Sequence, residues 1–395
     1  MRFKTCLPLA VLALLSGCGG TTKTVTTTVS QPPTIQHTET TQAETKDAAT
    51  DLGFPSFATR NTTRVGGADP VADAAGVAQA VYPGQADDSR PDIVTVVDAA
   101  DFAAAVSAGQ LMYPPLKAPL LYSQGGQLPA ATADALKNLK PKGSPKAGGA
   151  QVFQVGDPAA KPDGLKVAAV PGGDPAAVGR AVDRIASSAA GKPSGDVIVA
   201  SAAEPEFAMP AAGLAAKTGA PVLWVSGNNI PAPTLAAIRS RQSPSIYVIG
   251  PPEAVSDKAF ERLKKLGAVK RISGPDPVTN AIAVARYADG PFGWNVTDPG
   301  HGLVFASVNR IGDAAAAIAL AGAGTYGPLL LISQPGVLDK AVQDYLLDIT
   351  PGYDKDPVRG VYNHGWMMGG DDAISVPVQA RIDSLLEIQP VRGSG

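Results

Sequence analysis

The chain has 395 residues, of which 45% are hydrophobic and 17% are charged. This length exceeds that of one ordinary domain and is enough to build sizeable hydrophobic cores. The formal net charge of −2 and the pI of about 6.0 exclude the broad basic surface that neutralises nucleic-acid phosphates. We therefore expect no nucleic-acid partner.

The first residues, MRFKTCLPLAVLALLSGCGG, have the pattern of an export signal. Arg2 and Lys4 precede an apolar run that is too short for a permanent membrane span, and small residues follow it. The Leu-Ser-Gly-Cys ending resembles a bacterial lipobox, which implies cleavage after residue 17 and lipidation of Cys18. The alternative is ordinary cleavage nearby, with Cys18 playing no part.

Lipidation would place the protein outside the cytoplasm, anchored to the bacterial cell membrane. Each buried methylene of an acyl chain contributes about 0.8 kcal/mol, so two or three chains would hold the protein there. Cys6 would leave with the signal at residues 1–17, so the mature chain would have no disulfide.

Residues 18–62 are dominated by threonine and show no apolar periodicity. Such a segment cannot bury enough apolar surface to offset the entropy lost on ordering. The sequence therefore predicts a disordered tether between the lipid and the remainder of the chain.

A Gly-x-Asp-Pro pattern then occurs three times, at Asp69, Asp174 and Asp276. Other landmarks repeat with a similar period, among them the runs DIVTVV, DVIVAS and GLVFAS and the runs APLLYS, APVLWVS and GPLLLIS. A repeat of about 100 residues has the size of a domain and predicts a tandem array.

Each repeat reads as helix, strand, helix, strand, helix, strand, with a further strand before the Gly-x-Asp-Pro turn. The strand candidates are continuous apolar runs, which is typical of parallel strands covered on both faces. The sequence predicts an α/β fold of three tandem modules, with parallel sheets flanked by helices. We place the modules at 63–165, 166–268 and 269–391, and the third carries an insertion near DITPGYDKDPVRGVYNHG.

The middle copy resembles the bacterial type 2 cell-wall-binding repeat. The resemblance lies in the segment AAKTGAPVLW, the turn IGPPEAVS and the ending RISGPD. It covers about 63–391, more strongly in the second and third copies than in the first. It implies three Rossmann-like modules in a pseudo-threefold arrangement that bind a cell-wall polymer. The Arg-Tyr pair that follows the aspartate in the family is Pro-Val, Pro-Ala and Pro-Val in this chain.

The sequence contains partial matches to cofactor-binding motifs, but the residues around each match do not fit the motif. The glycines of a G-x-G-x-x-G pattern, Gly322, Gly324 and Gly327, follow a predicted helix and precede a strand, which reverses the dinucleotide-binding order. The segment AAGKPSG has proline after Lys192, where a phosphate-binding loop needs Ser or Thr. We expect no enzymatic activity, no cofactor and no metal, since the histidines also lack ligand spacing; they are His37, His301 and His364.

Two kinds of residue are candidates for polymer binding. The repeated aspartates suit helix capping, with proline at the first helical position, and are secondarily ligand candidates. Basic residues near helix C-termini stabilise the dipole by about 0.3–1 kcal/mol each, which is their ordinary role. The alternative is that recurring cations grip an anionic polymer. The candidate contacts are Arg64, Asp69, Asp174, Arg239, Arg241, Arg271, Asp276 and Arg310.

These observations predict a lipid-anchored, monomeric pseudo-trimer whose repeats bind an anionic cell-wall polymer non-covalently. Repetition of weak contacts along one polymer can raise avidity by about 10²–10⁴-fold. One alternative is a solute-binding receptor lipoprotein, which would have two lobes around one cleft. Another alternative is a protein–protein scaffold.

Overall fold

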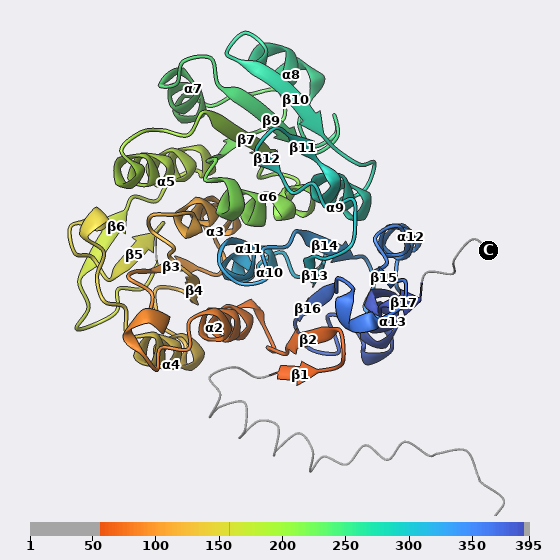
Figure 1. Cartoon of the computed structure of the whole chain (residues 1–395). Helices are drawn as coiled ribbons and strands as arrows, with labels where there is room; N and C mark the ends of the chain where they lie inside the picture. The colour runs from red at the N-terminus through yellow and green to blue at the C-terminus, as the bar shows by residue number, and fades with distance from the viewer. Residues whose placement is uncertain (1–55, 158, 391–395) are drawn as a thin grey trace, which may run out of the picture. The chain divides into compact units, whose positions relative to one another are not determined.

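The structure is a computed structural model that describes residues 56–157 and 159–390. The predicted export signal, Cys18 and residues 18–55 of the predicted tether lie outside this part of the chain. The described residues contain three parallel sheets flanked by helices (Figure 1). The predicted α/β fold is therefore confirmed.

The first sheet has the strand order β4-β3-β5-β6, with all pairs parallel. Its elements are α2 (Pro70–Val81), β3 (Val94–Asp98), α3 (Phe102–Ala108), β4 (Leu120–Ser123), α4 (Ala130–Leu139), β5 (Val152–Val155) and β6 (Val167–Val170). Short 3-10 helices, of which η2 (Gly109–Met112) extends α3, lie at 87–89, 109–112 and 145–147.

The second sheet repeats this order as β8-β7-β9-β10, again with all pairs parallel. Its elements are α5 (Pro175–Ala190), β7 (Asp196–Ser201), α6 (Pro205–Thr218), β8 (Val222–Val225), α7 (Ala232–Arg239), β9 (Ser245–Ile249), α8 (Asp257–Leu263) and β10 (Ala268–Ile272).

The third sheet has the order β14-β13-β16-β2-β1 and is completed from the other end of the chain. Strand β2 (Thr62–Val65) lies parallel to β16, and β1 (Ser56–Ala58) adds an antiparallel edge. The remaining elements are α9 (Pro277–Arg286), β11 (Ala288–Asp289), β12 (Phe292–Gly293), β13 (Gly302–Ser307), α10 (Asp313–Ala316), α11 (Ile318–Gly322), β14 (Leu329–Ile332), α12 (Lys340–Asp348), β16 (His364–Met368) and α13 (Val376–Leu386).

The strand before each Gly-x-Asp-Pro turn therefore belongs to the preceding sheet in space. Strand β6 pairs with β5 and β10 pairs with β9, although the sequence grouped both with the module that follows. The division 63–165, 166–268 and 269–391 is thus not the division of the sheets, and from here on a module is one sheet with the helices that pack on it. The helices after the turns, α2, α5 and α9, cross to the opposite edge of the next sheet and pack on β4, β8 and β14. We call these three the linker helices.

Residues 56–62, which the sequence assigned to the disordered tether, are ordered by contacts with the distant helix α13. The backbone N–H of Asn61 donates to Asp383 at 2.7 Å, and its side-chain amide donates to Glu387 at 2.9 Å. The hydroxyl of Thr59 also donates to Asp383, at 2.5 Å. No pattern local to residues 56–62 signals these partners, so this part of the tether prediction is wrong.

The sheets are buried on both faces, as the continuous apolar runs predicted. Val197 and Val199 of β7 face a cluster with α7 and α8, whereas Ile198 and Ala200 face the central core. Because side chains alternate along a strand, this split requires cover on both sides.

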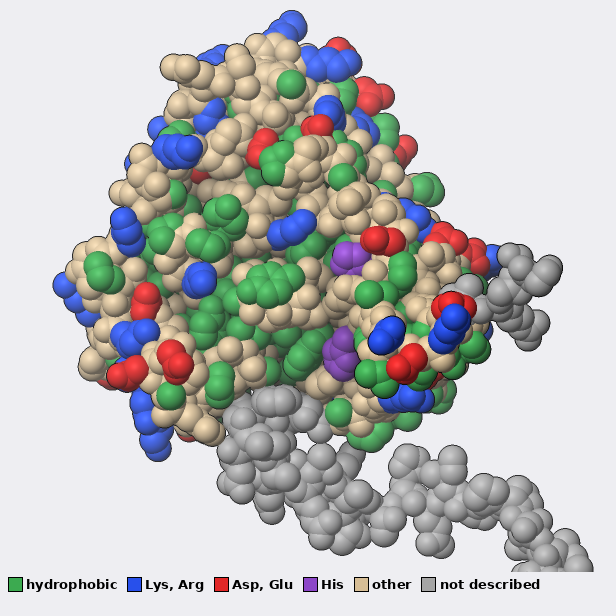
Figure 2. Space-filling model, viewed as in Figure 1, with side chains coloured by type: hydrophobic (Ala, Val, Ile, Leu, Met, Phe, Trp, Pro, Cys, Tyr) green, Lys and Arg blue, Asp and Glu red, His purple; other side chains and the backbone are tan. Residues whose placement is uncertain are grey.

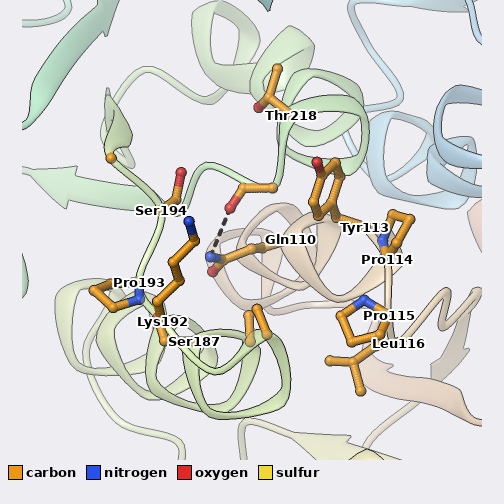
Figure 3. A pocket seen from close by; sticks show the side chains of 14 residues that line it. Gln110, Tyr113, Pro114, Pro115, Leu116, Ser187, Lys192, Pro193, Ser194 and Thr218 are labelled. Atoms are coloured by element: carbon orange, nitrogen blue, oxygen red, sulfur yellow. Dashed lines mark hydrogen bonds between the residues drawn. The ribbon is translucent and has the colours of Figure 1, made fainter.

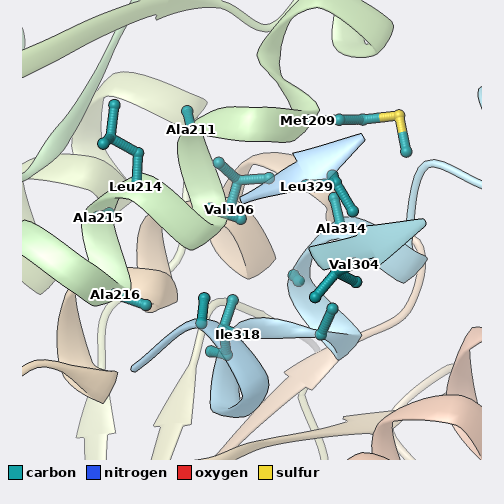
Figure 4. Packing of buried hydrophobic residues seen from close by; sticks show 14 of the residues in the cluster. Val106, Met209, Ala211, Leu214, Ala215, Ala216, Val304, Ala314, Ile318 and Leu329 are labelled. Atoms are coloured by element: carbon teal, nitrogen blue, oxygen red, sulfur yellow. The ribbon is translucent and has the colours of Figure 1, made fainter. Parts of the chain in front are cut away.

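The central core joins all three modules through their inner helices, α3 with η2, α6, and α10 with α11 (Figure 4). Small residues allow the close approach. A Cβ added at Gly109 would lie 2.4 Å from the carbonyl oxygen of Ala212 on α6, so only glycine fits there. Because burial of apolar surface is the main favourable term in folding, this shared core holds the three modules together.

The insertion in the third module forms a small accessory structure. Strand β15 (Gly352–Tyr353) pairs in parallel with β17 (Gln389–Pro390), next to the 3-10 helix η4 (Pro357–Arg359). Among residues 56–157 and 159–390, no helix has the length and apolar character needed to cross a bilayer.

Candidate functional site

The three repeated aspartates are N-cap residues of the linker helices. The carboxylate of Asp69 accepts from Ala72 N at 2.9 Å, that of Asp174 from Ala177 N at 3.0 Å, and that of Asp276 from Thr279 N at 2.9 Å. Proline occupies the first turn of each helix. The capping prediction is confirmed, and these carboxylates satisfy backbone donors that the helix leaves free.

Arg64 is a buried clamp, and Arg271 is a partly exposed one that makes the matching bonds. Arg64 is 6% exposed and donates to the carbonyl oxygens of Gly369, Gly370 and Ile374 at 2.6–2.8 Å. Arg271 makes the matching bonds in the second module, to Gly250 at 2.8 Å and Val255 at 2.9 Å.

Both arginines hold the loop that follows the third strand of their sheet, and each loop ends in the turn AVS or AIS. The first module has Ala169 at the corresponding strand position, and it also lacks this turn. The arginine and the turn therefore occur together, which indicates a structural partnership between them.

Arg310 lies in a buried charged cluster that joins the third module to α2. Its guanidinium forms ion pairs with Asp73 of α2 and with Asp313, and both carboxylate side chains are fully buried. Burial, together with the negative charge of Asp313, raises the pKa of Asp73 to about 9. Burial likewise raises the pKa of Asp313. The pair can therefore share a proton at neutral pH while Arg310 balances the remaining charge.

Arg241 is also buried, whereas Arg239 is exposed at the end of α7. Nη2 of Arg241 lies 2.6 Å from Oδ1 of Asp183, and the two side chains are 2% and 5% exposed. Nε of Arg241 also donates to Ser194 O at 2.9 Å. Arg64 and Arg241, both predicted as polymer contacts, are thus buried and bonded within this chain, which gives each a structural role in this structure.

Basic side chains do not gather into one patch on the face shown in Figure 2. Hydrophobic side chains cover the region over the inner helices, with Lys and Arg scattered among them and at the periphery (Figure 2). We therefore look for a binding site among the grooves of the surface and not in a continuous basic patch.

Such grooves lie at junctions between modules. We call the junction of the first and second modules the first junction, that of the second and third the second junction, and that of the third and first the third junction. The first and the third each have the C-terminal end of a linker helix with the loop after it, and the loops that follow the inner helices of the two adjoining modules, whereas at the second the hairpin after α9 packs against α6.

The first junction is an open groove with a volume of about 480 Å³. It lies between Tyr113–Leu116 on one side and Lys192–Gly195 on the other, with Gln110 between them (Figure 3). Its lining contains no acidic residue. Its volume falls within the range of about 300–1,000 Å³ that is typical of ligand pockets.

The floor of this groove is fixed by the buried ion pair described above. Oδ1 of Asp183 accepts from Arg241 and, at 3.4 and 3.3 Å, from Gln110 Nε2 and Ser187 Oγ. Gln110 Nε2 also donates to Gly219 O at 3.0 Å. These bonds fix the orientation of the Gln110 amide, and its buried Oε1 has no hydrogen-bond partner among the described residues.

The third junction is a smaller depression of about 280 Å³ that adjoins the groove, since Pro115 and Leu116 line both. Tyr82 and Tyr326 contribute aromatic side chains to it. Its charges are mixed, with Asp88 and Asp92 beside Arg90, Lys117 and Lys142.

The second junction is filled by this chain's own residues. Trp294, which follows the β11–β12 hairpin, is 5% exposed and packs against α6. The ammonium of Lys217 lies 5.0 Å from the centre of the Trp294 ring and donates to the carbonyl oxygen of Gly293. The lysine and the tryptophan therefore pack on each other at this junction.

The residues weighed for catalysis are not assembled in the described part of the chain. His301 pairs with Asp298 at 3.1 Å and His364 contacts Thr63 at 3.0 Å, so each has its own partner. Within residues 56–157 and 159–390, no group of three or more His, Cys, Asp or Glu could hold a metal ion. Gly322 ends α11 ahead of β14, which confirms the helix-then-strand order predicted for this glycine motif.

Comparison with known proteins gives a family match and a fold match. Residues 177–260 match the family model of cell wall binding domain 2 (CWB2). The solved structure of Cwp6 from Clostridium difficile superposes with a TM-score of 0.66 at 18% identity, and that of Cwp8 from Clostridium difficile with 0.62 at 15% identity. Each covers 83% of this chain, which in turn spans about half of each of them, 48% and 53%.

No curated protein matches the chain in sequence at a significant level. At these identities, the likeness to the solved structures concerns the fold, which extends beyond the matched segment to the other modules. Residues 177–260 are similar to cell wall binding domain 2, and the family resemblance that the sequence indicated is confirmed over this segment.

Proposed function

We propose that this protein binds a cell-wall polymer non-covalently and outside the cytoplasm, and that it is held at the cell membrane by a lipid on Cys18. The observation that carries the proposal is the match of residues 177–260 to the cell wall binding family, within a chain that repeats the same sheet three times. The pseudo-trimer acts as a monomer, because the three modules already enclose their common core. It binds without catalysis, and it needs no cofactor.

An anionic polymer suits the open groove of the first junction best. The groove has no acidic lining residue, and Lys192 forms no ion pair with the described residues. The overall charge is close to neutral, so attraction has to come from such local sites rather than from a general field.

Sedimentation with purified wall material tests the function. The full chain in detergent pellets with intact walls, and it stays in the supernatant when the anionic polymer has been extracted from them. Added salt weakens the binding, because the screening length falls to about 10 Å at 0.1 M. Equal pelleting with intact and extracted walls would contradict the choice of polymer, and no pelleting with either would contradict wall binding.

The lipid anchor is tested separately. Metabolic labelling with a fatty acid marks the wild-type chain, and Cys18→Ala removes the label and releases the protein from the membrane fraction. A Cys6→Ala variant is the matched control and keeps both properties.

The receptor alternative predicted two lobes around one cleft, whereas the described residues form three sheets around one helical core. A saturable thermal shift with a sugar or amino acid would revive it. The scaffold alternative predicts a protein partner whose capture does not depend on wall binding.

A further inference from the structure

We propose that the groove of the first junction is the principal polymer subsite and takes a sugar unit that carries an anionic group. The inference rests on the proposed function and goes further by naming the site and the chemistry of its ligand. It also assigns different roles to the three junctions.

One wall of the groove presents rigid flat surfaces. Tyr113 is 40% exposed, and the prolines at 114 and 115 continue its surface (Figure 3). The ring packs on the backbone of Gly219, where an added Cβ would lie 2.5 Å from Tyr113 Cδ1. A sugar ring has an apolar C–H face, and an aromatic ring held in place offers contact area at little entropic cost.

The rest of the groove supplies polar groups that suit the edge of a sugar. Ser187, Ser194 and Thr218 line it together with Gln110, and their hydroxyl oxygens, although bonded within the chain, retain acceptor capacity. Oε1 of Gln110 is a buried acceptor without a partner in the described chain, and a buried group of this kind costs about 1–3 kcal/mol. A small shift of the Gln110 side chain would bring Oε1 to a sugar hydroxyl in the groove, and a hydrogen bond there would remove this cost.

Lys192 provides the charge. Its side chain lies on the wall opposite Tyr113 and runs beside Ser194 in Figure 3. Because it is exposed and the groove lining has no carboxylate, its ammonium is available to a phosphate or carboxylate on the ligand. Lysine binds such anions through its compact positive charge.

The comparison of the three junctions explains why the first is favoured. At the second junction the buried Trp294 and Lys217 pack on each other, and we assign no subsite there. The third junction is smaller, and two acidic residues line it. Since Pro115 and Leu116 line both open junctions, a polymer chain can continue from the first into the third.

Three single variants of the full chain test the proposal by wall sedimentation. Tyr113→Ala removes the flat surface, Lys192→Glu reverses the charge, and Ala190→Trp places an indole at the exposed rim of the groove. Each raises the apparent dissociation constant about tenfold, the effect expected when one interaction of about 1.4 kcal/mol is lost. Tyr362→Ala and Lys258→Glu, at exposed positions outside the groove, bind walls as the wild type does.

The outcomes separate this inference from the proposed function. If the wild type pellets with walls and all three groove variants pellet equally well, the groove assignment is wrong while wall binding stands. If the wild type itself fails to pellet, the proposed function is wrong. Thermal unfolding of each variant shows that it is folded, and Ala190→Trp keeps every native polar group, so its loss of binding reports on access alone.

Discussion

Arg241 and Asp183 form an ion pair in the second module with an Nη2–Oδ1 distance of 2.6 Å, and both side chains are almost fully buried. The pair lies directly beneath the first junction. The arginine also holds Ser194 O, and the aspartate accepts from Gln110, so both walls of the groove depend on it. A residue that the sequence offered as a ligand contact therefore positions the groove from below.

Arg241→Ala leaves Asp183 charged and unpaired in the interior. We expect a loss of about 3–5 kcal/mol in the free energy of unfolding, as is typical when one partner of a buried pair is removed. Denaturant unfolding measures this. The exposed neighbour Arg239→Ala changes the value by less than about 0.5 kcal/mol. Similar small losses for both arginines would show that the Arg241 pair contributes little.

The Asp73–Asp313–Arg310 cluster makes stability depend on pH. The folded pKa of Asp73 is about 9, above the ordinary value of 3.8, so the folded state binds more protons between these limits. Stability therefore falls as the pH rises through this window, by at most about 1.4 kcal/mol per pH unit. Asp73→Asn, which copies Asn280 at the matching position of α9, flattens the profile between pH 5 and 8 in urea titrations.

The capping residue Asp69 on the same helix provides the control for this experiment. Asp69→Asn retains a good N-cap side chain, so it keeps both the stability and the slope of the wild type. A wild-type profile that is flat, or that rises with pH in the same window, would contradict the protonated state of the cluster.

The repeated aspartates are expected to stabilise helices and to play no part in wall binding. Asp276→Ala removes the bond to Thr279 N and costs about 0.5–2 kcal/mol. Wall sedimentation of this variant matches the wild type at temperatures where both are folded. A selective loss of sedimentation without a loss of stability would return the aspartate to the list of ligand contacts.

Trp294 is expected to act as a plug at the second junction. Trp294→Ala removes a buried indole and lowers the free energy of unfolding by about 3–5 kcal/mol. Since we assign no polymer subsite to this junction, wall binding of the folded variant is expected to equal that of the wild type. Weaker wall binding by this variant, at full occupancy of the folded state, would mean that the second junction also contacts the polymer.

The fold could be predicted largely from local signals. The runs DVIVAS and APVLWVS are strands with both faces buried, and Asp174 followed by proline starts a helix as capping chemistry requires. The partners of β6, β10 and β2 could not be predicted, because strand pairing depends on contacts between segments that no local pattern links.

The candidate site could not be predicted from the sequence, because its residues come from segments that no local pattern links. Lys192 lies in AAGKPSG, where the only local motif is an incomplete phosphate-binding loop. Tyr113 and Gln110 come from a different module, and nothing in the sequence places them opposite this lysine. Arg64 and Arg241 were chosen for their charge, but burial decides their role.

The pairing of β2 with β16 also determines how the molecule carries mechanical load. Any pull that reaches Ser56 from the N-terminal side first peels β1 from β2, one backbone bond after another. It then has to slide β2 lengthwise along β16, where the parallel bonds and the Arg64 clamp share the force. A protein tethered by its N-terminus and gripping a wall with its modules would therefore yield first at the sheet that its two ends build together.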